Sequence, residues 1–231
     1  MHARILGQMR SFLAFAVAAA IGMQAAGAQP RSAANPCVDE ANRNPRLMPM
    51  DEAPSRPEFL AYRDRLQAAV AQRDVDEVVE AADPGIRLGF DGSGGRDELR
   101  RLLAARPELW DELREVLALG GSFPSPTSFA APHVYANWPE QFDSFECAAV
   151  TGTHVRVRSR PALDAPIVAT VSYSIVRVIE PAQGKLWVPI ELADGRTGYM
   201  WHAYVRSPAD YRALFNRRDG RWLMTGFVAG D

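Results

Sequence analysis

The sequence predicts an α+β protein. A helix-rich α+β region is expected at residues 55–146, a small β-barrel at 147–207, and a closing β-hairpin at 208–231 that is a candidate to pack on the helical region. Apolar residues recur at helical spacing in the first region, and short apolar runs separated by turn residues fill the second. Asp219-Gly220 then stands between two apolar runs, which is a strong hairpin signal.

The first 28 residues have the composition of a secretory signal peptide. Arg4 and Arg10 give the positive start, and the apolar run that follows has about a dozen residues, against about 20 for a membrane span. Ala26-Gly27-Ala28 fits the small-x-small rule for cleavage. We therefore expect a periplasmic or secreted protein with no stable membrane span in the mature chain; an N-terminal membrane anchor is the alternative.

The charge balance bears on the choice of partner. The chain holds 26 basic and 28 acidic residues, and the predicted signal peptide contains basic residues but no acidic ones. Removing it leaves a more acidic mature chain, whereas binding to phosphates needs a concentrated basic face. We therefore expect no nucleic acid partner.

The segment before the first helix is irregular. Residues 29–54 are rich in Pro, Asn, Arg and Ala without an apolar period, which predicts a disordered lead-in. Ser55-x-x-Glu58 has the spacing of a capping box and predicts the start of the first helix. Asp74-x-x-Glu77 predicts the start of a second helix, which Asp83-Pro84-Gly85 should end.

A strand and two further helices are expected next. Residues 86–90 alternate apolar with polar or small residues, as a half-buried strand does. The glycine-rich loop 91–95 lacks the Lys and the spacing of a phosphate-binding loop. Helices are predicted at 96–105 and 107–119, and an aromatic, proline-rich linker with a possible strand at 129–135 completes the region.

Short strands dominate the segment 147–207. Val155 and Val157 alternate with Arg156 and Arg158, so one face of this strand should be buried and the other basic. Strands are expected at 155–158, 167–171, 173–179, 186–192 and 197–201. Strands at this spacing predict a small barrel.

Several motifs recur in a fixed order along the same segment. They are Val157-Arg158-Ser159-x-Pro161, Val168-x-Thr170, Trp187-x-x-Ile190, Asp194-Gly195-x-x-Gly198-Tyr199 and Tyr204-Val205. Together they resemble the bacterial SH3 (SH3b) domain over about a quarter of the chain. Arg156 and Arg160 depart from the pattern, which usually has Asn and Gly at these places, so any ligand contact made by the first loop of relatives is not carried over.

The SH3b resemblance implies a non-enzymatic envelope protein that binds cell-wall or peptide ligands, with peptidoglycan or an envelope peptide or protein as partner. Aromatic rings suit an extended-ligand groove, and arginine forks suit carboxylates. The ligand-binding candidates are Trp187, Tyr199, Trp201, Tyr204, Arg156 and Arg158. Two alternatives stay open: Trp187 and Tyr199 fill or cover the barrel, and the arginines form a solvated strand face.

The closing hairpin carries a second resemblance. Phe-x-Arg-x-Asp-Gly-x-Trp at residues 215–222, with the helix–helix–strand–helix order before it, is similar to domains of the nuclear transport factor 2 type, a cone-shaped α+β fold. This resemblance implies that the barrel is inserted into, or packed beside, a split α+β domain. The alternative function is therefore small-molecule binding or catalysis in a pocket formed by residues 55–135 and 211–228.

Cys37 and Cys147 are the two cysteines of the chain, and in an oxidising compartment we expect them to form a disulfide; two unpaired thiols are the alternative. The histidines after the signal peptide, His133, His154 and His202, lie in separate segments without metal-ligand spacing. We therefore expect no catalytic residues, no metal and no cofactor. An interaction or envelope-stability protein with no defined ligand is a third hypothesis.

Overall fold

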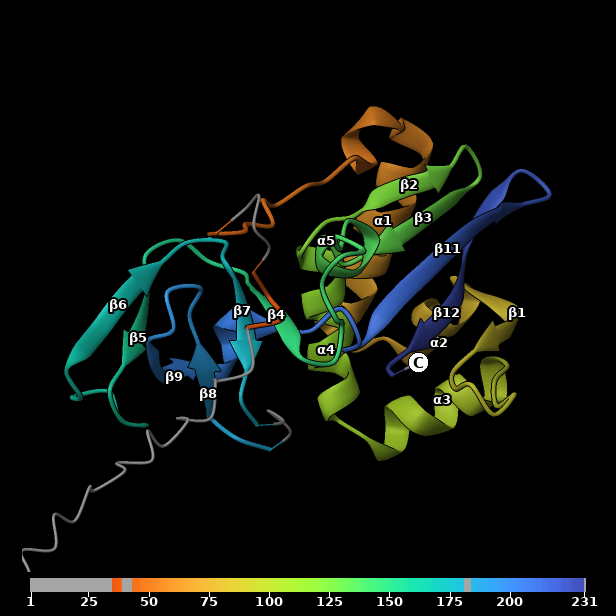
Figure 1. Cartoon of the computed structure of the whole chain (residues 1–231). Coiled ribbons are helices and arrows are strands. Elements are labelled where there is room, and N and C mark those ends of the chain that lie inside the picture. The colour runs from red at the N-terminus through yellow and green to blue at the C-terminus, as the bar shows by residue number, and fades with distance from the viewer. Residues whose placement is uncertain (1–34, 39–42, 181–183, 231) are drawn as a thin grey trace, which may run out of the picture. The chain divides into compact units, whose positions relative to one another are not determined.

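A computed structural model describes residues 35–38, 43–180 and 184–230. The predicted signal peptide, residues 1–28, lies outside the described residues. The described part is α+β, with helices and two separate β-sheets (Figure 1). In this part of the chain, no helix has the length and apolar character needed to cross a membrane.

The helices gather in the first half of the chain. They are α1 (Pro57–Gln72), α2 (Val75–Glu80), α3 (Arg96–Ala105), α4 (Glu108–Ala118) and the short α5 (His133–Ala136), with 3₁₀ turns at η1 (Ala53–Ser55) and η2 (His202–Tyr204). The predicted start at Asp74 is confirmed, because its carboxylate accepts a hydrogen bond from the Glu77 N–H. The predicted cap at Ser55 is wrong: Ser55 belongs to η1, and its hydroxyl donates to the carbonyl of Glu52.

The first sheet has five strands in the order β1-β12-β11-β3-β2. Their bounds are β1 (Ala82–Arg87), β2 (Ser122–Ser125), β3 (Ser128–Ala131), β11 (Arg212–Arg218) and β12 (Arg221–Val228). β1 runs parallel to β12, and the other pairs are antiparallel. The closing hairpin therefore packs on the helix-rich region and supplies two inner strands of its sheet.

Strand β1 begins earlier than the sequence predicts and includes Asp83-Pro84-Gly85. This is possible because β1 lies at the sheet edge, where a proline need not donate a ladder hydrogen bond. The Asp83 carboxylate is buried, accepts from the Gly85 N–H and pairs with Arg218 at 3.0 Å. Residues of a type typical of turns are thus part of an edge strand here.

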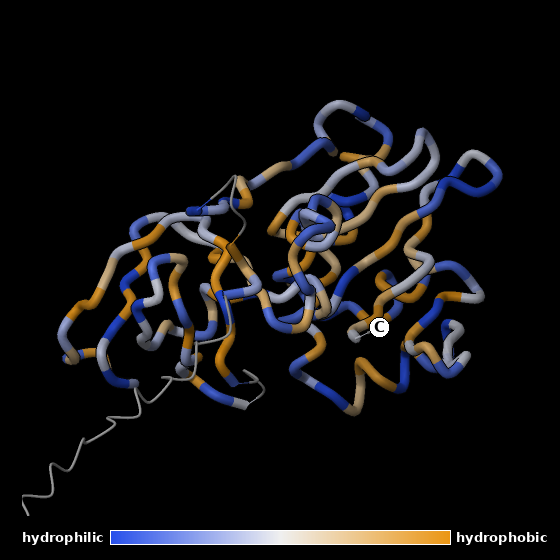
Figure 2. The backbone as a smooth tube through the Cα atoms, in the orientation of Figure 1, coloured by the Kyte–Doolittle hydropathy of each residue, from blue (hydrophilic) through white to orange (hydrophobic). Residues whose placement is uncertain are grey.

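The β11–β12 turn follows the predicted chemistry. Asp219 and Gly220 have φ values of 49° and 79°, and Arg218 lies opposite Arg221 in the strand register that flanks them. Two positive φ values are typical of the type I′ hairpin turn, whose twist matches that of the flanking strands. The tip of this hairpin is hydrophilic, and apolar residues follow along both strands (Figure 2).

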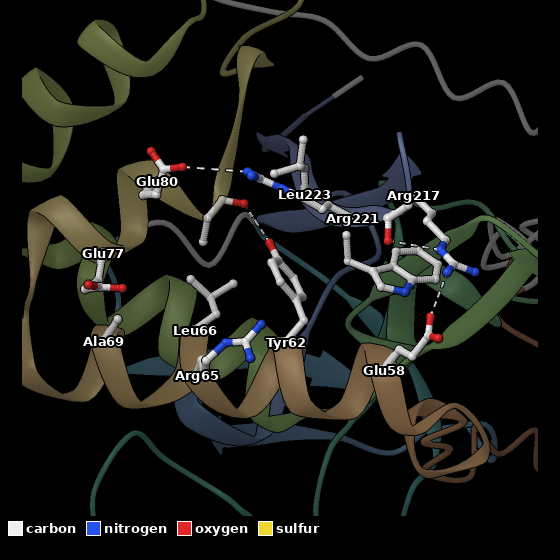
Figure 3. A pocket seen from close by; sticks show the side chains of 13 residues that line it. Glu58, Tyr62, Arg65, Leu66, Ala69, Glu77, Glu80, Arg217, Arg221 and Leu223 are labelled. Carbon is white, nitrogen blue, oxygen red and sulfur yellow. Dashed lines mark hydrogen bonds and ion pairs between the residues drawn. The ribbon is translucent and has the colours of Figure 1, made fainter.

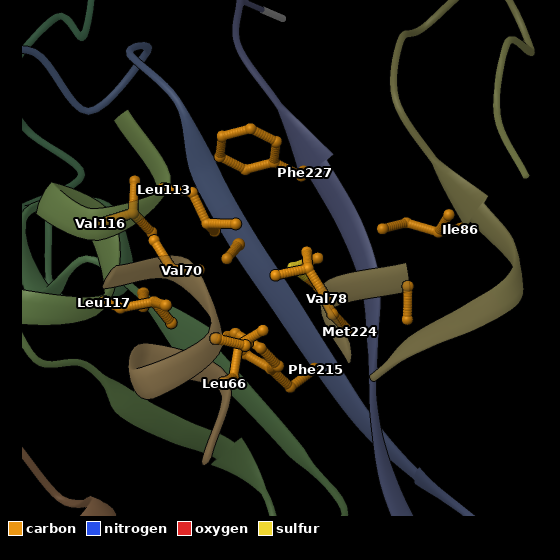
Figure 4. Packing of buried hydrophobic residues seen from close by; sticks show 14 of the residues in the cluster. Leu66, Val70, Val78, Ile86, Leu113, Val116, Leu117, Phe215, Met224 and Phe227 are labelled. Atoms are coloured by element: carbon orange, nitrogen blue, oxygen red, sulfur yellow. The ribbon is translucent and has the colours of Figure 1, made fainter. Parts of the chain in front are cut away.

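The main core lies between the helices and one face of the five-stranded sheet (Figure 4). Leu66 and Val70 of α1 meet Phe215 and Met224 of the closing hairpin in this cluster. The ring of Phe59 lies 4.3 Å from that of Phe129, centroid to centroid. Because burying such a side chain is worth about 1.5–3 kcal/mol, this cluster is the main stabilising contact of the region.

The second sheet has seven strands in the order β10-β4-β7-β8-β9-β5-β6. Their bounds are β4 (Cys147–Val150), β5 (Val155–Arg158), β6 (Ile167–Val171), β7 (Ile175–Val178), β8 (Trp187–Glu191), β9 (Thr197–Trp201) and β10 (Val205–Arg206). Among the described residues no ladder joins β6 to β10, so the expected closed barrel is corrected to an open sheet. A two-residue β10 offers too few backbone groups for a closing ladder.

The described part of the lead-in contacts this second sheet. Cys37 and Cys147 form a disulfide, as predicted, across a sequence separation of 110 residues. Leu47 is buried, and its N–H donates to the carbonyl of Tyr173 at 2.8 Å, while Arg46 bridges to Ser174. Residues 43–54 therefore differ from the disordered lead-in that the sequence predicts, because paired backbone and a buried leucine hold them.

Candidate functional site

A groove lies on the outer face of the seven-stranded sheet. Val188 and Met200 point inward and are fully buried, so their neighbours on β8 and β9 face outward. Trp187 and Trp201 are directly opposed across these two strands. Their rings meet edge to face, with centroids 5.4 Å apart and planes at 84°. This pair forms one wall of the groove.

Tyr204, in η2, adds a third ring to the groove and is 46% exposed. A Cβ placed on Gly152 would lie 3.1 Å from Cδ1 of Tyr204, so the ring lies close against this glycine. The Thr151 N–H also donates to the carbonyl of Tyr204 at 3.0 Å. The backbone of Thr151 and Gly152 therefore helps to fix the position of Tyr204.

Strand β5 supplies the basic part of the groove. Val155 and Val157 are buried, and Arg156 and Arg158 lie on the opposite face, as the alternation predicts. Arg158 of β5 lies opposite Tyr199 of β9 in the strand register. The guanidinium of Arg158 donates to the carbonyl of Ala165 at 2.7 Å. Among the described residues, the guanidinium of Arg156 has no hydrogen bond or ion pair.

Five of the six predicted ligand-binding residues line this groove of about 470 Å³. Its lining consists of Thr153, His154, Val155, Arg156, Arg158, Leu163, Trp187, Trp201 and Tyr204. Tyr199 is not part of the lining. It lies one row further along the sheet, opposite Pro189 and Arg158.

Four lining residues were not among the predicted site residues: Thr153, His154, Val155 and Leu163. Val155 is mostly buried in the core beneath the groove. His154 precedes Arg156 by two positions, so the same two-residue period could have placed it on the basic face. Thr153 lies in the same segment, which leads directly into β5. Leu163 gave no signal, because its position depends on the loop between β5 and β6, where it is 75% exposed.

A second hollow, of about 490 Å³, lies between α1, α2 and the β11–β12 hairpin (Figure 3). It falls within the ranges that the sequence predicts for a cone-type pocket. Its rim is charged: Glu58 pairs with Arg217 at 2.9 Å, and Glu80 with Arg221 at 3.7 Å. Opposite charges on this rim therefore largely neutralise one another.

Tyr62 lies in the wall of this second hollow and is 7% exposed. Its hydroxyl donates to the carbonyl of Ala81 at 2.8 Å, and burial raises the pKa of the phenol well above its usual value. A phenol held neutral and already donating is poorly suited to act as a base. The space beside it is filled by rings, with Phe59 in contact with Phe215 and Trp222.

The histidines lie apart, as their spacing predicts. His133 is buried and its Nδ1 lies 2.6 Å from the carbonyl of Leu119; burial lowers the pKa of its imidazole. His154 lines the groove, and the ring of His202 lies 5.3 Å from that of Trp201. Among the described residues there is no group of three or more His, Cys, Asp or Glu placed to hold a metal ion.

No protein-family model matches the chain, and no curated protein matches it. Solved structures that are similar to it include two proteins of unknown function. One is an NTF-2-like protein of unknown function from Shewanella oneidensis MR-1, 12% identical, covering 75% of this chain and 97% of that one, with a TM-score of 0.30. The other, from Nostoc punctiforme, is a protein of unknown function with a cystatin-like fold, 11% identical, covering 78% and 94%, with a TM-score of 0.24.

The first of these two structures carries the name of the fold that the closing hairpin resembles. Neither is described as an SH3-type domain. At these TM-scores the similarity carries no argument about what the groove or the second hollow binds.

Proposed function

We propose that the chain is a non-enzymatic binding protein of the cell envelope, which holds a cell-wall or peptide ligand in the groove of its seven-stranded sheet. The observation that carries the proposal is the convergence of Trp187, Trp201 and Tyr204 with Arg156 and Arg158 in one hollow. These residues come from three separate segments. Three rings and two guanidiniums side by side are the chemistry that recognises an extended, partly anionic ligand.

The state of the side chains also favours binding. Tyr204 and Leu163 are exposed although both offer large apolar surfaces, and the indole pair is only partly buried. Apolar surface left open in one patch is typical of an interaction site, and the exposed guanidiniums beside it have donors that a ligand can use. A ligand would cover both. The disulfide fits an oxidising compartment such as the envelope.

Co-sedimentation of the mature protein with purified peptidoglycan sacculi tests the proposal. We expect the protein to pellet with sacculi at low salt, and Trp187→Ala or Tyr204→Ala to weaken retention by about tenfold, since a ring that anchors a ligand is often worth more than 1 kcal/mol. Failure of the unmodified protein to pellet would contradict the wall-binding form of the proposal.

Two matched variants show whether the groove itself is used. Tyr199→Ala removes a ring from the same outer face but outside the lining, and Phe145→Ala removes a ring that is 63% exposed outside the groove. Both should bind sacculi within about twofold of the unmodified protein. Equal losses for Tyr199→Ala and Tyr204→Ala would mean that general surface stickiness causes the retention.

The second hollow keeps small-molecule binding as a second candidate function. Arg65 and Glu77 line it and have no ion-pair partner among the described residues, in contrast to the paired Glu58 and Arg217. An unpaired cation and an unpaired anion at one hollow suit a small zwitterion.

Titration with free amino acids, followed by the amide signals of residues around Leu66 and Leu223, tests this candidate. Saturable shifts that disappear in Arg65→Gln would support it. Shifts that stay linear in concentration for the whole amino acid set would remove it, and sacculus binding by the groove would be unaffected.

A further inference from the structure

We infer that the groove recognises a carboxylate of the ligand, which Arg156 and Arg158 bind. Arg160 is a positioning residue: it binds Asp164 and so keeps the Asp164 carboxylate from occupying the site of the ligand carboxylate. The inference rests on the proposed function and names the ligand class of that same groove. It predicts that the groove binds acidic groups of the wall peptides rather than the glycan backbone.

The pairing of arginines differs sharply between the groove and its surroundings. Residues 151–206 contain six arginines. Four of them have a carboxylate within ion-pair distance: Arg160, Arg177, Arg196 and Arg206. The two without such a partner among the described residues are Arg156 and Arg158, and both line the groove. Within residues 151–206, the arginines without a carboxylate partner among the described residues are thus the two at the groove.

The lining supports the same conclusion. It includes no aspartate and no glutamate, so the guanidiniums have no internal competitor on the walls. Arg158 uses one donor on the carbonyl of Ala165, which fixes the side chain and leaves other donors for a ligand. Arg forks match the two oxygens of a carboxylate better than the scattered hydroxyls of a sugar.

The indole pair adds a second argument against the glycan. A sugar ring is best received by a flat aromatic face, whereas Trp187 and Trp201 stand nearly perpendicular, at 84°. This arrangement offers a corner, which fits a small apolar side chain. A peptide with a small side chain near its carboxylate would fill the corner and reach the arginines together.

Asp164 is an internal carboxylate that could compete with a ligand for Arg158, because the charge of Arg158 acts on it. It directly precedes Ala165, whose carbonyl Arg158 already contacts. Its carboxylate is instead held by Arg160 at 3.0 Å. The hydrogen bond from Arg160 is the main cause that keeps the pKa of Asp164 below its usual range, and the charge of Arg158 contributes least. Arg160 therefore holds this anion on the loop and away from the groove.

Amidation of the sacculi tests the ligand class without changing the polymer. Carboxyl groups of one portion are converted to amides with carbodiimide and ammonium, and both portions are used in parallel co-sedimentation with the disulfide-bonded mature protein. We expect binding to amidated sacculi to be at least tenfold weaker, as the loss of charge-assisted hydrogen bonds implies.

The two possible failures are distinguishable. If the protein binds untreated and amidated sacculi equally, the carboxylate inference is overturned and the proposed function stands. If it binds neither, the proposed function itself fails. Arg156→Gln/Arg158→Gln should abolish the preference for untreated sacculi, and an unchanged preference in this double variant would also overturn the inference.

Variants outside the groove test the role of Arg160. Arg160→Ala should free Asp164 to pair with Arg158 and weaken binding to untreated sacculi by about three- to tenfold, a modest effect because the pair is exposed. Arg160→Ala/Asp164→Asn should restore binding to within about twofold, which a merely structural loss would not do. Wild-type binding by Arg160→Ala, or no rescue in the double variant, would contradict the positioning role.

Discussion

The guanidinium of Arg206, in β10, lies 2.9 Å from the carboxylate of Glu115, in α4. Arg206 is 4% exposed, also lies 3.7 Å from Glu112, and donates to the carbonyl of Tyr211 at 2.7 Å. Its Nε has no acceptor among the described residues. One buried cation thus joins the seven-stranded sheet to a helix of the other region and serves more than one carboxylate.

Replacing Glu112 should change how stability depends on pH. Burial raises the pKa of Glu112, and the nearby charge of Arg206 opposes this shift. A carboxyl group with a raised folded-state pKa favours folding below its unfolded pKa of about 4.3 and loses that contribution as the pH rises through its folded pKa. Glu112→Gln should therefore gain thermal stability relative to the unmodified protein at pH 7, by about 2 °C, and less at pH 4. Thermal melts at both pH values give the measurement, and an equal difference at both would contradict it.

Replacing Arg206 should be costly. Arg206→Met keeps an unbranched, partly apolar stem but removes the charge and leaves the Tyr211 carbonyl without its donor. We expect a loss of about 2–4 kcal/mol in the free energy of unfolding, measured by urea denaturation. The control is Arg100→Met, which breaks an exposed pair with Asp76 and should cost less than about 1 kcal/mol. Equal costs for the two variants would mean that burial does not strengthen the Arg206 contacts.

Gly198 should be indispensable for the approach of β5 to β9. A Cβ at this position would lie 2.6 Å from Cγ1 of Val157 and 2.8 Å from the backbone oxygen of Arg158. Gly198→Ala must push the strands apart, at a cost of about 1–3 kcal/mol, and should weaken sacculus binding as well. In Gly226→Ala the new methyl group would meet only the Leu214 side chain, at 3.4 Å or more. Gly226→Ala should retain sacculus binding. A similar loss of binding in both variants would mean that the close approach of β5 to β9 is not the cause.

Removing the disulfide should release the lead-in from the second sheet. Cys37→Ser/Cys147→Ser should lower the free energy of unfolding by about 2–5 kcal/mol. Hydrogen exchange should become faster at two amides that join the lead-in to the sheet: Leu47, which donates to Tyr173, and Ile175, which donates to Pro45. Unchanged exchange at these amides would show that the lead-in holds its place without the covalent link.

Local chemistry explains what the sequence predicted well. The Asp219-Gly220 turn needs two positive φ values, and few residue pairs tolerate them, so the hairpin is readable from the sequence. The helix start at Asp74 depends on one side chain and an N–H three residues away. Arg156 and Arg158 were found because the outward face of a strand recurs every second residue. Trp187, Trp201 and Tyr204 were found because aromatic rings suit a ligand groove.

Long-range pairing explains what the sequence did not predict. Nothing near Ala82 indicates that it pairs with Met224 in a parallel ladder, or that Pro84 sits in an edge strand. The open sheet instead of a barrel depends on the absence of one ladder, which no local pattern encodes. Tyr199 and Tyr204 are both aromatic candidates in the sequence, but Tyr199 lies opposite Arg158 and Pro189 outside the lining, and Tyr204 reaches the groove from η2.

The order β1-β12-β11-β3-β2 puts β11 and β12 between strands that come much earlier in the sequence. A chain that ends at residue 207 would have both flanks of this sheet and nothing to join them. Phe59, Phe129 and Leu66 would then face water instead of Phe215 and Met224. Premature termination or proteolysis that removes β11 and β12 should therefore yield a product with an exposed core, which quality-control proteases should destroy.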